Sequence, residues 1–151
     1  MKLTVITPLA IVLEAEDVIH VRAEDASGAF GILECHADML TALAISVVTW
    51  RDRASAEHHV AVRGGMLTVQ DGVAVSIVTP EAVAGDDLHR LEAEVLGRFR
   101  RTLAEEQAQR VDAQRLYLAA IRQIERLVRP DPSRGPPRLS TGDDSGEDGV
   151  P

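Results

Sequence analysis

Residues 28–43 read Gly-Ala-Phe-Gly-Ile-Leu-Glu-Cys-His-Ala-Asp-Met-Leu-Thr-Ala-Leu, and the rest of the chain can be interpreted around this stretch. Gly28 and Gly31 flank one aromatic residue, which suits two tight backbone turns where a Cβ atom would clash. His36 then leads into a short apolar segment that begins at Met39. The pattern predicts a strand–turn–strand corner in a β domain.

Short runs typical of strands lie on both sides of this corner. They cover residues 2–7, 11–13, 18–23, 45–50, 58–62, 66–69 and 73–78. Within the third run, Ile19 and Val21 alternate with polar residues, the period-2 pattern of a half-buried strand. Gly64-Gly65 interrupts the pattern between the fifth run and the sixth. Many short strands separated by turn signals predict a sandwich or barrel, which closes here near Ala84.

Asp71-Gly72 predicts a hairpin between the last two runs. A two-residue loop would place Val69 opposite Ala74, mixing large and small side chains. A three-residue loop over residues 71–73 instead pairs Val69 with Val75 and Leu67 with Ile77. Because a slip of one residue turns every side chain to the other face, the longer loop buries more apolar surface and is favoured.

The period changes after Gly85, where Asp86 or Asp87 can cap a helix. A first apolar stripe has helical spacing and contains Leu88, Leu91, Val95, Phe99 and Leu103. A second contains Leu116, Ala120, Ile121, Ile124, Leu127 and Val128. Between them, residues 105–110 are polar and include neither Gly nor Pro, so both a turn and an unbroken helix are possible. Folding back near residues 107–112 would bury both stripes, and we expect this hairpin when the chain is alone; beside a partner, the arm could extend.

Charge is spread unevenly over the 151 residues. Residues 1–85 carry a net charge of −6, residues 86–129 of +1 and residues 130–151 of −3. The last segment holds five of the seven prolines and four glycines, so it is expected to be a disordered acidic tail. The sequence thus predicts a β domain over residues 1–85 and a helical arm over residues 86–129.

Several classes of function do not fit this chain. The acidic first block disfavours nucleic acid, whose phosphates require Lys and Arg. No apolar run approaches the roughly 20 residues of a membrane span, and the N-terminus lacks a signal-peptide pattern, so we expect a cytoplasmic chain or one held at a membrane by a partner. The single cysteine, Cys35, excludes an internal disulfide.

Metal and covalent chemistry are also disfavoured. The imidazoles of His20, His36, His58 and His59 show no zinc-ligand spacing, and no Cys-x-x-Cys pair exists, so no metal is expected. Cys35 is expected to be a surface thiol, since no arrangement for activating a nucleophile is evident. No phosphate-binding Gly-rich loop is present.

Three sequence strings resemble the epsilon subunit of rotary F-type ATP synthases. They are Gly-Ala-Phe-Gly-Ile with His-Ala-Asp-Met-Leu-Thr, Val-Arg-Gly-Gly-Met-Leu-Thr-Val-Gln, and Ala-Val-Ala-Gly-Asp-Asp-Leu, and the resemblance extends over residues 3–129 in the family's order. The first string is similar to the corresponding sequence in an alternate branch of these ATP synthases, a branch that is often associated with sodium pumping. Glu34-Cys35 stands where the family usually has Pro-Gly, and the helix breakers common between the family's two C-terminal helices are missing.

The resemblance implies a ten-stranded β-sandwich followed by a two-helix arm, without catalytic residues or cofactor. It implies a place at the foot of the central stalk, on the cytoplasmic face of the bacterial plasma membrane, with the gamma subunit and the c ring as partners. The arm, with nine arginines between Arg90 and Arg129, could contact the alpha/beta head and inhibit ATP hydrolysis. The candidate ring-facing loop residues are Gly28, Ala29, Gly31, Glu34, Cys35, His36 and Asp38.

Some members of this family bind ATP through an Ile/Leu-Asp-x-x-Arg-Ala motif that opens the first helix. Here only Asp87 and Arg90 match, since Asp86 and Leu91 replace the apolar and small positions. Asp87 is equally explained as a charge favoured by the helix dipole. A different class of function also stays open, namely a freestanding β-sandwich adaptor whose arm forms a coiled-coil dimer.

Overall fold

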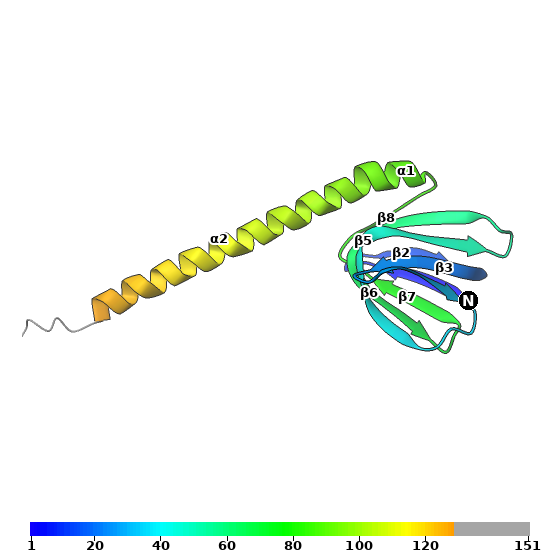
Figure 1. Ribbon diagram of the computed structural model, residues 1–151, viewed down its shortest axis with the longest axis horizontal. Helices are drawn as coiled ribbons and strands as arrows, with labels where there is room; N and C mark the ends of the chain where they lie inside the picture. Colours follow the sequence, from blue (N-terminus) through cyan, green and yellow to red (C-terminus); the bar gives the residue numbers. More distant parts are fainter. Residues whose placement is uncertain (129–151) are drawn as a thin grey trace, which may run out of the picture. The chain divides into compact units, whose positions relative to one another are not determined.

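The computed structural model describes residues 1–128, which form eight β-strands followed by a helical segment (Figure 1). The strands are β1 (Lys2–Ile6), β2 (Ile11–Ala15), β3 (Val18–Asp25), β4 (Gly28–Leu33), β5 (Met39–Asp52), β6 (Glu57–Gln70), β7 (Ala74–Val78) and β8 (Ala82–Gly85). The helical segment consists of α1 (Leu88–Arg90), the π-helical turn η1 (Leu91–Val95) and α2 (Leu96–Val128). The chain divides into two compact units after Ala108, so the first unit contains every strand and the first turns of α2.

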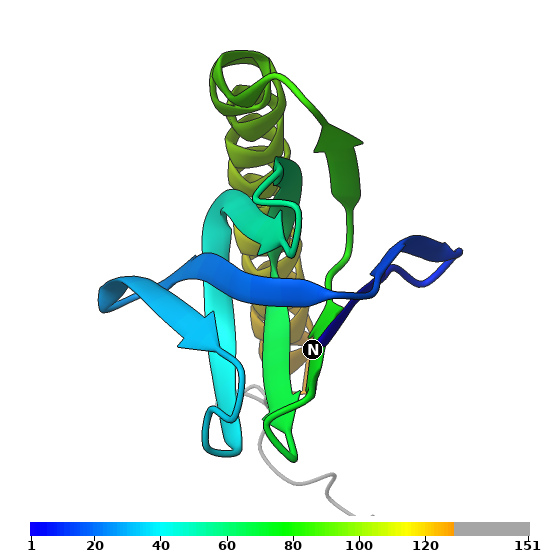
Figure 2. The same cartoon turned by 90° about the vertical axis from the view of Figure 1, so that its right-hand side faces the viewer.

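The strands form one curved sheet in the order β2-β1-β7-β6-β5-β3-β4, and β8 pairs with β6. Neighbouring strands are antiparallel except β1 and β7, which are parallel. Figure 2 shows β3 running across the direction of β6 and β7. The sheet therefore folds over its own inner face and forms a β-sandwich.

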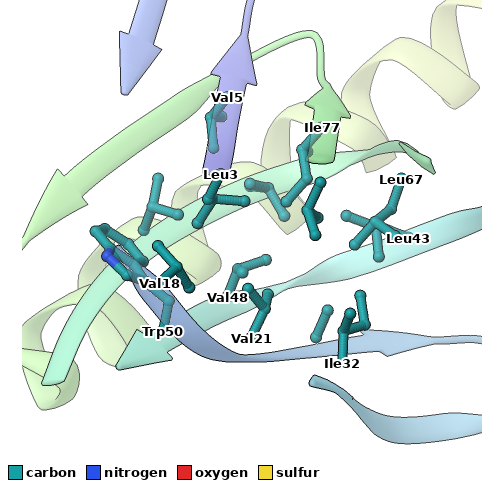
Figure 3. Close-up of a cluster of buried hydrophobic side chains, with 14 of the residues drawn as sticks. Leu3, Val5, Val18, Val21, Ile32, Leu43, Val48, Trp50, Leu67 and Ile77 are labelled. Carbon is teal, nitrogen blue, oxygen red and sulfur yellow. The ribbon is translucent and has the colours of Figure 1, made fainter. Parts of the chain in front are cut away.

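The core of this sandwich is almost entirely aliphatic, as the low aromatic content requires. Side chains from β1 and from β3 to β7 converge on it (Figure 3). Trp50 is the one tryptophan of the chain, and it is buried at one side of this cluster. The alternation of buried residues along the strands explains the period-2 pattern of the sequence.

The hairpin between β6 and β7 has the predicted three-residue loop. Val69 pairs with Val75, Leu67 pairs with Ile77, and Gln70 pairs with Ala74 as the last pair before the turn. The prediction is confirmed, and its reason holds, because the four paired apolar side chains are all buried.

The ten strands that the resemblance implies are not found, because the described residues form eight, and two of these strands are long and continuous. Residues 58–62 and 66–69 both belong to β6, which keeps its pairing with β5 through Gly64-Gly65. These glycines have φ values of +72° and +114°, so they bend the strand instead of ending it. Residues 39–43 and 45–50 likewise form the single strand β5. The sandwich thus contains eight strands, two of them 14 residues long.

The helical segment begins at a capped end and contains no turn. Asp87 is the N-cap, and its Oδ1 accepts a hydrogen bond from the Arg90 backbone N–H at 3.2 Å. The prediction of two helices is wrong, since α2 runs unbroken through residues 107–112. A turn there would give up backbone hydrogen bonds in a segment without a single helix breaker.

The first helical turns pack against the strands in a second apolar cluster. Leu91, Leu96 and Phe99 are buried there against Ala61 of β6. Val95 is half-buried, whereas Leu88 and Leu103 of the predicted stripe are exposed. This cluster explains why the first compact unit extends beyond the last strand.

Two predictions about domain organisation are not tested by the fold. The expected disordered tail over residues 130–151 lies outside the described residues. That residues 1–85 fold independently stays a prediction, although β8 ends at Gly85.

Candidate docking surfaces

A row of apolar side chains crosses five strands on the outer face of the sheet. Cross-strand pairing joins its members as neighbours, and residues paired in this way point to the same face. The row, called the docking row below, contains Ile11, Ile6, Val78, Met66 and Ala42.

The docking row faces outward. Ile11 is 60% exposed, Val78 53% and Met66 42%. The adjacent residues Ile77 and Leu67 are fully buried, as expected when successive side chains of a strand alternate between faces. Leu40 of β5 is exposed and pairs with Thr68, two positions along the same face. Contiguous exposed apolar surface of this kind marks an interaction site.

Sequence reasoning missed this row because it assigned the apolar residues of each strand to the core. The available signal was the occurrence of consecutive apolar residues, Met66-Leu67 and Ile77-Val78. A strand with one face in solvent should alternate. When two large apolar residues are adjacent in such a strand, one of the two side chains faces outward and is exposed to solvent unless a partner binds over it.

A second surface lies where the loop of residues 34–38 contacts the β6–β7 turn. The Cys35 backbone N–H donates to the Gly72 carbonyl oxygen at 3.0 Å, and the Asp71 N–H donates to Asp38 Oδ1 at 2.8 Å. The approach is so close that a Cβ on Gly72 would lie 2.7 Å from the Cys35 Cα. The candidates Glu34, Cys35, His36 and Asp38 thus belong to one fixed loop.

Ionic contacts hold the start of this loop. Glu34 Oε1 accepts hydrogen bonds from the N-terminal ammonium at 3.2 Å and from Arg53 Nη2 at 3.3 Å. His36 places its Nδ1 2.7 Å from the Ala37 carbonyl oxygen. Cys35 is exposed at the loop surface. The loop therefore presents a thiol and polar groups on a backbone that is fixed from two sides.

The other three ring-facing candidates do not lie in a loop. Gly28, Ala29 and Gly31 belong to β4, and Gly31 pairs with Arg22 without a positive φ, so the expected turn at Gly31 is wrong. Gly28 and Leu33, the two ends of β4, are about 17 Å apart at the usual rise of a strand. The seven candidates are therefore spread along β4 and the loop that follows it, and do not form one patch.

The β3–β4 turn next to Gly28 is also fixed. Asp25 Oδ1 accepts hydrogen bonds from the Ser27 N–H at 2.8 Å and the Ser27 hydroxyl at 2.6 Å, and Oδ2 accepts one from Thr41 at 3.0 Å. These bonds hold the pKa of Asp25 below its usual value, with the Ser27 hydroxyl as the largest cause. Both ends of β4 thus offer an ordered surface.

Asp87 and Arg90 line a groove of about 670 Å³ beside β8 and the first helical turns. Their polar groups are already engaged, because Asp87 caps the helix and Arg90 Nε donates to Glu94 Oε2 at 3.2 Å. The same lining contains Asp86 and Glu94 and also Arg98 and Arg101, so its acidic and basic side chains are equal in number. In this structure the two motif residues thus serve the helix itself, and nucleotide binding through Asp87 and Arg90 stays a hypothesis.

Two of the histidines considered as metal ligands, His58 and His59, are engaged in structural contacts. His58 stacks on Trp50 and donates from Nε2 to Asp52 Oδ2 at 3.2 Å, which is the largest cause of a lowered pKa for Asp52. His59 Nδ1 lies 3.0 Å from the Thr49 hydroxyl. Within residues 1–128, His, Cys, Asp and Glu form no cluster suited to a metal ion. Over the same residues, no helix combines the length and apolar character of a membrane span.

The part of α2 beyond Ala108 is a third exposed surface. Leu116, Tyr117, Ile124 and Leu127 are all exposed there, as are the arginines of the same segment. Apolar side chains in this number on one helix are unusual without a partner.

Comparison with known proteins gives consistent matches. Residues 1–85 match the domain family described as "ATP synthase, Delta/Epsilon chain, beta-sandwich domain". The chain is 40% identical over 135 residues to the ATP synthase epsilon chain 2 of Paraburkholderia xenovorans, covering 89% of this chain and 96% of the relative. It is 43% identical over 129 residues to the ATP synthase epsilon chain 2 of Cereibacter sphaeroides, covering 83% and 86%.

A similar fold occurs in a solved structure. A chain of the mitochondrial ATP synthase of Euglena gracilis matches with a TM-score of 0.52 and 24% identity over 70% of this chain. This chain spans 62% of the length of that chain. At 24% identity, this similarity shows a shared fold and nothing more.

Proposed function

The chain belongs to the epsilon subunits of F-type ATP synthases, and on that premise we propose that it is a non-catalytic subunit of the central stalk. In this role it couples ion-driven rotation of the c ring to ATP synthesis by the catalytic head, and it needs no cofactor. Family membership does not support the alternative of a freestanding adaptor unrelated to rotation. The exposed docking row is the observation that carries the proposal, because a subunit without its own chemistry must act through the surfaces that it presents.

The docking row is proposed to bind the gamma subunit. It is apolar across five strands, and the strands beneath it have a packed core, so it offers a preformed surface that loses little entropy on binding. An apolar patch of this kind fits a complementary apolar face better than the polar loops of a membrane ring.

The two ends of β4 are proposed as the contacts with the c ring. The loop of residues 34–38 and the segment that contains Ala29 are too far apart for one short cross-linker. Each end is therefore tested by itself: cross-links from Cys35 and, separately, from a cysteine that replaces Ala29 should reach loops of the c subunits. Cross-links from both positions only to head subunits would contradict this placement.

The arm beyond Ala108 is proposed to contact the alpha/beta head and to inhibit ATP hydrolysis. At 100° per residue, Arg115, Arg122 and Arg126 lie within about 40° of one another around the helix. Tyr117 and Ile124 lie on the opposite side. The segment can thus present an apolar face to one partner and a basic face to acidic groups of another.

The proposed location is the cytoplasmic face of the bacterial plasma membrane, where the chain is held by its partners. The resemblance to the sodium-associated branch stays a prediction, because the coupling ion is bound by the ring.

Binding to purified gamma subunit tests the docking row. Val78→Asp places a charge in the middle of the row and should weaken binding at least tenfold, since an uncompensated charge would be buried at the interface. Val73→Asp is the matched control, because Val73 is 58% exposed but lies in the β6–β7 turn. Isothermal calorimetry should show a loss of binding for Val78→Asp alone. Equal binding by both variants would remove the row as the gamma contact.

A further inference from the structure

Four charged side chains join the first turns of α2 to the strands. Arg63 lies on β6, Glu81 lies between β7 and β8, and Arg98 and Glu106 lie on α2. Arg63 Nη1 donates to Glu106 Oε1 at 2.8 Å, and Arg98 Nη2 donates to Glu81 Oε1 at 2.7 Å. Arg63 Nε lies 3.8 Å from Glu81 Oε2, which connects the two pairs. The four side chains thus form one row of ion pairs with alternating charge, Glu106–Arg63–Glu81–Arg98, inside the first compact unit.

Arg63 is the least exposed of these four charged residues. Its side chain is 17% exposed, and its Nε is buried without a hydrogen-bond partner among the described residues. Its backbone N–H donates to the Glu81 carbonyl oxygen at 3.0 Å, which fixes the two residues beside each other. A largely buried guanidinium is costly unless carboxylates compensate it, so Arg63 favours the position of α2 that brings Glu106 to it.

Within the first compact unit, the part of α2 that is at least half-buried ends at Glu106. Phe99 is buried, and Thr102 and Glu106 are half-buried on the same face, three and seven positions further on. Residues 107–120 are all exposed. Glu106 is therefore the last residue of the first unit that the strands partly cover.

We infer that Glu106, Arg63, Glu81 and Arg98 form an ion-pair latch that fixes α2 to the sandwich as far as Glu106. The buried stripe of Leu91, Leu96 and Phe99 supplies apolar packing, but such packing is non-directional. The hydrogen-bonded ion pairs set the rotation and register of the helix. Any movement of the arm on its partners then begins beyond Glu106, and not at the boundary after Gly85.

Hydrogen exchange of the full-length chain, followed by mass spectrometry, tests the latch. Glu106→Gln removes the charge that faces Arg63 and preserves the length of the side chain. Backbone amides of residues 100–106 should then exchange about tenfold faster, which corresponds to a decrease of about 1.4 kcal/mol in the free energy of local opening. Glu105→Gln is the matched control, because Glu105 is exposed and has no recorded ion pair in the part of the chain that the structure describes; its exchange should stay within twofold of the wild type.

A double variant separates the latch from a general effect on the helix. Arg63→Gln and Glu106→Gln each remove the Arg63–Glu106 contact, so the double variant should speed exchange by clearly less than the product of the two single effects. Trp50 fluorescence verifies that the sandwich remains folded in each variant. Equal exchange in Glu105→Gln and Glu106→Gln, or multiplied effects in the double variant, would overturn the inference.

Discussion

Gly65 lies at the bend of β6, next to the end of β7. Its φ is +114°, and a Cβ atom on it would overlap the Val78 carbonyl oxygen. Two separate requirements, the backbone conformation and the lack of space, therefore demand glycine at this position. The next two residues alternate as in any strand, with Met66 outward in the docking row and Leu67 buried in the core.

Gly65→Ala should thus lower the free energy of unfolding by more than about 3 kcal/mol, because strain and overlap add. Gly97→Ala is the control, since Gly97 lies in α2 with open space around its Cα and should gain about 0.5–1 kcal/mol. Urea unfolding followed by Trp50 fluorescence measures both changes. A loss below 1 kcal/mol for Gly65→Ala would mean that β7 moves away at little cost.

Single elements differed in how far the sequence could predict them. The β6–β7 hairpin was predictable to its register, because only one loop length buries all four large apolar side chains. The strand count was not, because Gly64-Gly65 is compatible with a break as well as with a bend, and only the pairing with β5 distinguishes them. The arm was predicted as two helices on the argument that both stripes need burial. In the structure, the helix without a breaker remains continuous, and every residue of its second stripe except the half-buried Ile121 is exposed.

The docking row and the latch show what a pattern along the chain leaves out. Both bring together residues far apart in sequence, such as Ile6 with Val78 and Arg63 with Glu106. Periodicity indicates which face a residue occupies, but not which strand lies beside it. The loop of residues 34–38 could be predicted as a loop, whereas its contact with the β6–β7 turn depends on the sheet order.

The division of the chain into elements gives a second prediction. A fragment that ends at Gly85 should still melt cooperatively, since the main core is formed by strands alone. It should melt roughly 10 °C below a fragment that ends at Ala108, because it leaves Ala61 and its apolar neighbours uncovered. Circular dichroism measures both transitions. An unfolded shorter fragment would show that residues 1–85 are not an independent domain, and equal melting temperatures would show that the first helical turns contribute nothing.

At the scale of the whole molecule, the contacts proposed for assembly and for inhibition lie in different compact units. Deleting residues 111–151 leaves Met1–Ala108 complete, and with it the docking row, both ends of β4 and the latch. The assembled complex should therefore form normally and hydrolyse ATP severalfold faster than with the full chain. Replacing Arg115, Arg122 and Arg126 with glutamine should give part of this increase. Unchanged hydrolysis after the deletion would mean that the arm has no inhibitory role.

The central claim is that the chain rotates with the gamma subunit as one body. A photoreactive benzoylphenylalanine in place of Met66 tests it directly, because it reacts with whatever covers the docking row. In membrane vesicles that contain the assembled enzyme, irradiation should join the chain to gamma while ion-driven ATP synthesis continues, since two parts of one rotor do not move against each other. A cross-link to a subunit of the catalytic head, or loss of ATP synthesis in proportion to a cross-link with gamma, would contradict the account.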